Sequence, residues 1–374
     1  MSGKGLEGVA AATTALSLVD GTAGRLLYRG YAIGDLVAHT TFEETAYLLW
    51  YGRLPNAAEL AQLRVQMADW RTLPKSIQQI IQAHPVEANP MDVLRTVVSA
   101  LGSIGDFTGP PSIQQAISLT AKIPTILATF HRHRLGQPMP TSRLDLSHTA
   151  HYLYLLNGTE PAPSHVRALD AYLVLTADHG MNASTFTARV IASTLSDLVS
   201  SVTGAIGALK GPLHGGAPAK VAEMLEAIGT ADQAEPWLRA ALERGDRIMG
   251  FGHRVYKTDD PRSAALRKLA DELSAAQDAA WLAMAHHVED VALRLLDEYK
   301  PGRKLYTNVE FYAAAVLRGV GLPADLYTPT FGASRTVGWT AHVLEQISDN
   351  RLIRPAAEYI GPSDLAYPAL AGRA

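Results

Sequence analysis

Apolar side chains recur every three or four residues along most of the chain, which is the spacing of one face of an α-helix. The clearest stripes are Leu60, Leu63, Met67, Trp70 and Met91, Leu94, Val98, Leu101. The same pattern predicts helices over residues 112–130, 164–176, 183–209, 217–228, 261–285 and 286–299, and after Val309 and Arg335. Little room is left for alternating strands and helices, so the pattern predicts an all-α fold and argues against a doubly wound nucleotide-binding sheet.

Polar residues mark where several of these helices begin. Thr41 is followed three residues later by Glu44, a spacing at which each side chain can bond the other's backbone amide. Asn56 and Glu59 repeat this arrangement. Asn89 precedes a proline, which suits the first position of a helix. We therefore expect helices to begin directly after residues 41, 56 and 89.

Two stretches depart from the general pattern. Residues 15–19 and 26–28 are apolar except for Ser17 and enclose Asp20-Gly21, a pair that tolerates the positive φ of tight turns, so we expect a small β-hairpin. Residues 183–209 are crowded with Ala, Ser, Thr and Gly, whose small side chains let helices approach closely. We expect one helix there, buried either within a subunit or across a dimer interface.

The composition restricts the class of protein. A chain of 374 residues is long enough for two domains. Its net charge is −3 and its basic residues are scattered, which argues against nucleic acid as a partner. It has no cysteine, so disulfides, thiolate nucleophiles and cysteine-ligated metals are excluded. It has no apolar signal segment and no apolar run of about 18 residues, so we expect a cytoplasmic protein without a membrane span.

Three of the 13 histidines stand at glycine-flanked breaks between predicted helices. His179, His214 and His253 lie in the segments ADHGMN, GPLHGG and GFGHR. Glycine lets the backbone approach a ligand and frees amide groups that can hold an anion or a developing negative charge. A single histidine of this kind would more often be a structural residue at a capped helix end, but three together favour a catalytic or binding site.

The remaining histidines have ordinary helical or linker surroundings, and we interpret them as structural; they are His39, His84, His131, His133, His148, His151, His165, His286, His287 and His342. No His-x-x-x-His or His-Glu-x-x-His spacing occurs, so we predict no catalytic metal. Cations crowd the segment RVYKTDDPR after His253, which suits a polyanionic or dicarboxylate substrate. Arg335, Arg351 and Arg354 lie at predicted element boundaries.

Four segments then carry a resemblance: LHGGA at 213–217, GFGH through DPR at 250–262, NVEFY at 308–312 and FGASR at 331–335. In this order they resemble the citrate synthase family of the tricarboxylic acid cycle, over about residues 6–362. The resemblance implies a two-domain helical homodimer, with a large domain (1–214 and 316–374) and a small domain (215–315) that closes over the substrates. It also implies condensation of acetyl-CoA with oxaloacetate and hydrolysis of citryl-CoA to citrate and CoA. Acetyl-CoA is a substrate, and no cofactor is implied.

The resemblance assigns a role to each matching residue. His214 would bond the thioester carbonyl and stabilise the enolate of acetyl-CoA, Glu310 would remove the methyl proton, and His253 would polarise and protonate the oxaloacetate carbonyl. The residues implied to bind the oxaloacetate carboxylates are His179, Arg262, Arg335 and, from the other subunit, Arg354. Those implied to bind CoA are Ile248, Met249, Gly250, Phe251 and Gly252 at the adenine and Lys257 at a phosphate.

The sequence departs from the family in two places. Glu310 stands where the family usually has Asp, and one extra methylene adds about 1.5 Å. A misplacement of about 1 Å can cost about 100-fold in rate, so we expect the local backbone to compensate. Ala356 replaces a residue that is basic in many relatives. Two alternatives stay open: a 2-methylcitrate synthase that uses propionyl-CoA, and a non-catalytic homologue that binds CoA or a dicarboxylate.

Overall fold

The computed structural model describes residues 4–6, 8–215, 217–253, 255–256, 258, 260–274, 279–367 and 371. Lys257, predicted to contact CoA, lies outside the described residues. The helices are α1 (Ile33–His39), α2 (Phe42–Tyr51), α3 (Ala57–Trp70), α4 (Lys75–Gln82), α5 (Pro90–Leu101), α6 (Ile113–Arg134), α7 (His148–Asn157), α8 (Pro163–Thr176), α9 (Ala183–Ser193), α10 (Leu198–Leu209), α11 (Ala217–Ile228), α12 (Ala234–Glu243), α13 (Pro261–Ser274), α14 (Ala279–Tyr299), α15 (Val309–Gly319) and α16 (Tyr327–Ser348). The strands are β1 (Ser17–Asp20), β2 (Arg25–Tyr28) and β3 (Tyr31–Ala32), paired antiparallel in that order. The predicted all-α fold with an N-terminal hairpin is confirmed.

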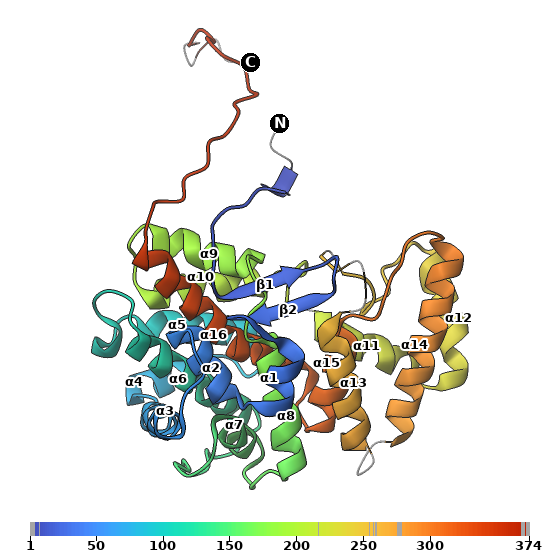
Figure 1. The fold of residues 1–374 in the computed structure, drawn as a ribbon, viewed down its shortest axis with the longest axis horizontal. Coiled ribbons are helices and arrows are strands. Elements are labelled where there is room, and N and C mark those ends of the chain that lie inside the picture. Colours follow the sequence, from blue (N-terminus) through green and yellow to red (C-terminus); the bar gives the residue numbers. More distant parts are fainter. Residues whose placement is uncertain are drawn as a thin grey trace.

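Helix α16 is the central element of the larger body. It packs against α2, α6, α8, α9 and α10, and Trp339 and Arg335 are among the largest fully buried side chains of the described chain. Figure 1 shows α12 and α14 as a yellow and orange group beside the blue and green helices, with α11, α13 and α15 between the two. The predicted domain limits at 215 and 315 remain predictions, and the second of them falls inside α15.

The three predicted helix starts are confirmed. Thr41 and Glu44 form a full capping box at α2, and Asn56 and Glu59 form another at α3. Asn89 accepts a hydrogen bond at the start of α5. These starts were predictable because both partners of each bond lie within four residues of each other in the sequence.

The expected single helix over 183–209 is wrong, because the chain breaks between α9 and α10. Leu195 takes a left-handed φ of 65°, which ends the first helix. Asp197 then caps the second, accepting from the Ser200 amide at 2.7 Å and from the Ser200 hydroxyl at 2.7 Å. A local cap therefore outweighs the continuous run of small residues. The predicted burial holds in part, since Ala188, Ala192 and Ala205 are fully buried.

Two further expectations about helix limits are wrong. The predicted break at Ala285–His286 lies inside α14, because the apolar face of that helix continues unbroken across it. Arg335 was expected at an element boundary, yet it lies in the middle of α16. There, Gly332 marks no turn, and a Cβ added to it would lie in ordinary van der Waals contact with Leu209, at 3.5 Å.

The hairpin forms as predicted, but for a different physical reason. Asp20 pairs with Arg25 across a four-residue turn. The Asp20 carboxylate accepts hydrogen bonds from the amides of Thr22 at 3.0 Å and Ala23 at 2.9 Å. The positive φ of the turn falls on Gly24, at 62°, and not on Gly21. The Asp20 side chain therefore stabilises this turn, and the turn does not require a glycine at position 21 for its backbone conformation.

Candidate active site

The three singled-out histidines all lie in loops between helices, as the glycine pattern predicted. His179 lies between α8 and α9, followed by Gly180 with a left-handed φ of 59°. Its Nε2 is 3.2 Å from the Tyr256 hydroxyl, and its ring centroid is 5.5 Å from that of His253. The chain therefore brings two predicted substrate-facing histidines edge to face, with a tyrosine against both.

The protonation of the His253 ring follows from its backbone contacts. The amides of Val255 and Tyr256 both donate to His253 Nδ1, each at 3.1 Å. Backbone amides can only donate, so Nδ1 holds a lone pair. A neutral His253 ring therefore carries its proton on Nε2, where it can donate to a substrate oxygen.

His214 has the opposite tautomer. Its Nε2 accepts from the Ser184 amide, which can only donate, at 3.3 Å, and it lies 2.8 Å from the Ser184 hydroxyl. Trp339 Nε1 donates to that hydroxyl at 3.0 Å. The ring proton of neutral His214 is therefore on Nδ1. Burial, together with the charge of Arg335, lowers the pKa of His214 to about 4. The ring is neutral at pH 7 and presents an N–H donor.

Two buried arginines supply positive charge. Arg262 binds Asp260 in bidentate fashion, Nε to Oδ1 at 3.0 Å and Nη2 to Oδ2 at 2.8 Å. Burial opposes its charge, but Asp260 overcomes this and holds the pKa of Arg262 above its ordinary value. Arg335 donates from Nε to the Thr176 carbonyl at 2.7 Å, and burial lowers the pKa of this guanidinium. No ion pair joins Arg335 to a described carboxylate, so its charge is available to an anion.

Glu310 lies in the first turn of α15, where its amide donates to the Asn308 side chain at 3.0 Å. Its carboxylate makes no hydrogen bond to any described residue. Burial raises the pKa of Glu310 to about 7, although the charges of Arg262 and Arg335 oppose the rise. A half-buried carboxylate whose pKa is close to neutrality is suited to remove and return a proton.

Electrostatic coupling indicates which predicted residues are neighbours. Burial lowers the pKa of His179 far below its ordinary value, and the charges of Arg262, Arg335, His253 and His214 lower it further. The charges of Arg262 and Arg335 also lower the pKa of Glu310, against the effect of burial. The described residues brought together are thus His179, His214, His253, Arg262, Glu310 and Arg335. Arg354 lies apart, exposed on the extended segment after α16 that leaves the body in Figure 1.

The loop predicted to receive adenine is tied to the start of α15. Gly250 and Gly252 have left-handed φ values of 85° and 76°. The Gly252 amide donates to the Tyr306 carbonyl at 2.7 Å, and the Asn308 amide donates to the Gly250 carbonyl at 2.9 Å. Asn308 Nδ2 also donates to the Gly252 carbonyl at 2.8 Å. Because Asn308 also caps α15, this loop and Glu310 are fixed by one side chain.

The other predicted members of this loop are Ile248 and Phe251, which are buried, and Met249, which is half-buried.

The sequence reasoning missed a buried polar network behind His179. His342, interpreted as ordinary, places Nε2 3.2 Å from Asp178 Oδ1 and accepts at Nδ1 from Arg189 at 3.0 Å. Burial opposes the charge of Asp178, but His342 lowers the pKa of this carboxyl to about 2. Arg189 also pairs with Glu345 at 2.6 Å. No local signal connects residues 178 and 342, since 164 positions separate them in the chain.

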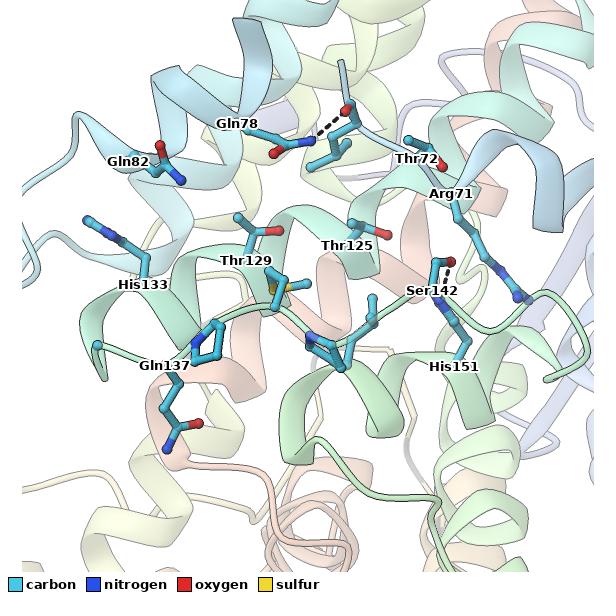
Figure 2. Close-up of a pocket in the computed structure, with 16 residues that line it drawn as sticks. Arg71, Thr72, Gln78, Gln82, Thr125, Thr129, His133, Gln137, Ser142 and His151 are labelled. Atoms are coloured by element: carbon cyan, nitrogen blue, oxygen red, sulfur yellow. Dashed lines mark hydrogen bonds between the residues drawn. The ribbon is translucent and has the colours of Figure 1, made fainter. Parts of the chain in front are cut away.

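Two cavities lie away from this cluster. One, of about 380 Å³, is lined by side chains of α4, α6, α7 and the loop before α7, among them Gln78, Thr129 and His151 (Figure 2). The other, of about 410 Å³, is lined by Glu43 and Asp170. Neither is lined by His179, His214, His253 or Glu310.

None of the described helices is long and apolar enough for a membrane span. Within the described residues there is also no group of three or more His, Asp or Glu side chains that could hold a metal ion.

Comparison with protein families gives a match over residues 5–356 to the model described as "Citrate synthase, C-terminal domain". Among curated relatives, citrate synthase 2 of Bacillus subtilis is 45% identical over 378 residues, covering 99% of both chains. The 2-methylcitrate synthase of Shewanella oneidensis is 41% identical, covering 100% of this chain and 98% of its own.

Solved structures agree in fold. The citrate synthase of Thermotoga maritima is 40% identical with a TM-score of 0.88, covering 99% of each chain. The citrate synthase of Thermoplasma acidophilum, solved as a ternary complex with carboxymethyl coenzyme A and oxaloacetate, is 31% identical with a TM-score of 0.92, again covering 99% of each chain.

Proposed function

The chain belongs to the citrate synthase family, and on that premise we propose that it condenses acetyl-CoA with oxaloacetate and hydrolyses the resulting citryl-CoA. The observation that best supports this activity is the Glu310 carboxylate. It is unbonded among the described residues, burial raises its pKa to about 7, and the charges of the buried Arg262 and Arg335 act on it.

The proposed chemistry begins with proton transfer. The Glu310 carboxylate takes a proton from the methyl group of acetyl-CoA, and the C–H electron pair moves into the enolate. The developing oxyanion accepts a hydrogen bond from His214 Nδ1–H, the tautomer that the Ser184 amide supports. The Glu310 carboxylate and the His214 imidazole are both protein side chains, and the proposed reaction uses no cofactor, since acetyl-CoA is a substrate.

Carbon–carbon bond formation follows. The enolate carbon attacks the keto carbon of oxaloacetate, and the alkoxide that forms takes the proton of His253 Nε2. Water then attacks the thioester of citryl-CoA, which yields citrate and CoA thiol. The tautomer of His253 fits this step because its two backbone bonds leave the proton on Nε2.

We assign the oxaloacetate carboxylates to His179, Arg262 and Arg335. The bonds of Arg262 to Asp260 use Nε and Nη2, so a substrate carboxylate would bind through Nη1. We further propose that the protein is a homodimer in which Arg354 reaches the partner's site. Its exposed position on the extended segment after α16 supports this reach. The loop 248–252 and Lys257 remain our assignment for CoA.

A thiol-release assay tests the proposed function. Oxaloacetate is mixed with acetyl-CoA or propionyl-CoA, and free CoA is followed with a thiol reagent; omission of oxaloacetate is the control. We expect kcat/KM for acetyl-CoA to be at least about tenfold higher, since one methylene in a pocket is worth about 10–200-fold. Faster reaction with propionyl-CoA would identify a 2-methylcitrate synthase, an activity named for a relative at 41% identity. No release with either would leave the non-catalytic alternative.

A further inference from the structure

The β1–β2 hairpin contacts the two loops that carry the histidines assigned to oxaloacetate, His179 and His253. Figure 1 shows the hairpin above α1 and α16, with its turn directed toward the yellow and orange helices. One flank of the hairpin contacts residues 178–180, and its turn contacts Val255. No residue of the hairpin takes part in the proposed reaction, so its contacts with the two loops have another role.

The side chains of Ser17 on β1 and Tyr28 on β2, here called the flank of the hairpin, fix the backbone on either side of His179. The Tyr28 hydroxyl donates to the Asp178 carbonyl at 2.7 Å and accepts from the Asp178 amide at 3.1 Å. The Ser17 hydroxyl donates to Asp178 Oδ2 and accepts from the Gly180 amide at 3.1 Å. Strand side chains therefore bond both peptide neighbours of His179.

The turn makes a contact that only glycine permits. A Cβ added to Gly21 would lie 2.0 Å from the Val255 oxygen and 2.6 Å from its carbonyl carbon. The φ of Gly21 is not left-handed, so the backbone conformation itself would accept alanine. Gly21 is therefore required for space, because the hairpin lies directly against the Val255 carbonyl.

That carbonyl belongs to the peptide group that orients His253. The Val255 oxygen and the Tyr256 amide are in one planar peptide unit. The Tyr256 amide donates to His253 Nδ1 at 3.1 Å and helps keep the ring proton on Nε2. Pressure on the oxygen must tilt the plane and move the N–H that His253 accepts from.

We propose that the β1–β2 hairpin positions the two histidines assigned to oxaloacetate: Ser17 and Tyr28 fix the loop of His179, and Gly21 supports the peptide that orients His253. These are positioning residues, since none of them is assigned to touch a substrate. The proposal rests on the proposed function for its effect on rate, but its effect on the two rings can be measured without substrate.

The central test is Gly21→Ala, with Gly34→Ala as the matched control. Gly34 has no atom within 4 Å of an added Cβ and no positive φ, so the same substitution there leaves the protein as it was. We expect Gly21→Ala to lower kcat by about 10–100-fold, the cost of about 1 Å of misplacement. In substrate-free protein with isotope-labelled histidine, the ring NMR signals of His253 should shift while those of His214 stay in place. Assignment comes from His253→Gln and His214→Gln.

The flank is tested with Ser17→Ala and rescue by Ser17→Thr. Removing the hydroxyl should weaken oxaloacetate binding about tenfold in titration calorimetry and shift the ring signals of His179, whereas Thr keeps a hydroxyl and should restore both. A merely structural hairpin would instead lower the melting temperature with unmoved histidine signals. If Gly21→Ala does not fold, the Ser17 pair decides the proposal.

Unchanged ring signals of His253 and His179 in folded Gly21→Ala and Ser17→Ala would overturn the proposal, whatever the catalytic assay gives. Absence of CoA release by the wild-type protein would instead refute the proposed function, and the substrate-free signals would still report on the hairpin. The two failures are therefore distinguishable.

Discussion

Glu310 and Asp170 are two carboxyl groups whose pKa values are raised to a similar degree but whose hydrogen-bond partners differ. Burial raises the pKa of each to about 7, with a further contribution from a neighbouring negative charge, Asp260 for Glu310 and Glu43 for Asp170. Asp170 accepts from the Phe42 amide at 3.1 Å and from the Thr149 hydroxyl at 2.6 Å. The carboxylate of Glu310 makes no hydrogen bond among the described residues.

The surroundings of Asp170 explain its burial. Its bond to Phe42 caps the first turn of α2, and Glu43 accepts from the His148 amide at 2.9 Å and so caps α7. Each carboxylate completes the N-terminus of a helix other than its own. A raised pKa therefore indicates burial, while the contacts of the oxygens separate a helix-capping group from a candidate base.

The sharpest way to break this comparison is Glu310→Gln, which removes the base and preserves the shape. We expect kcat to fall by about 10³-fold, within the range of general-base contributions, because the amide cannot accept the methyl proton. Oxaloacetate binding, measured by calorimetry, should remain within about threefold of wild type. CoA release near the wild-type rate would remove Glu310 from the mechanism.

The pH dependence of the rate sharpens the assignment. Glu310 must be ionised to act as a base, so kcat/KM should fall about tenfold per unit as the pH drops below about 7. His214, whose pKa is lowered to about 4, does not titrate in this range. The profile is measured from pH 5 to pH 9 with acetyl-CoA varied at saturating oxaloacetate. A flat profile between pH 5 and pH 7 would contradict the raised pKa.

The smallest effect on rate is expected for Asp170→Asn. Its kcat should stay within about twofold of wild type. The free energy of unfolding should fall by about 1–3 kcal/mol, because asparagine keeps only one acceptor oxygen for the two donors, the Phe42 amide and the Thr149 hydroxyl. Urea denaturation measures the stability. Loss of activity in a folded Asp170→Asn protein would show that Asp170 is also needed for catalysis and would contradict its assignment as a helix-capping group only.

The same variant has a signature in pH. The pKa of Asp170 is higher in the folded chain, near 7, than in the unfolded chain, so folding takes up a proton between about pH 4 and pH 7. Unfolding free energy contributed by this group therefore decreases as pH rises through that window. Asp170 faces Glu43 on α2 and Arg167 on its own helix. Asp170→Asn should flatten the slope, and so should Glu310→Gln, but only the latter should abolish activity.

Local signals in the sequence predicted much of the fold. Capping pairs such as Thr41 with Glu44 act within one turn, and the glycines around His179, His214 and His253 mark the loops of the site. Asp197 was overlooked as a cap, which joined α9 and α10 into one helix. The roles of Asp178 and His342 could not be predicted, because their partners are distant in sequence and meet only after helices pack.

The hairpin has a consequence for the order in which the chain can mature during synthesis. The Ala15 amide donates to Glu345 Oε1 at 2.8 Å, across 330 positions of sequence. At about 5–20 residues per second, roughly 16–66 s separate the emergence of these two partners from the ribosome. A nascent chain that stops before Tyr327 already holds all three histidines and Glu310, yet it lacks Arg335 and the helix that anchors the hairpin. The site can therefore be completed only after α16 has been synthesised.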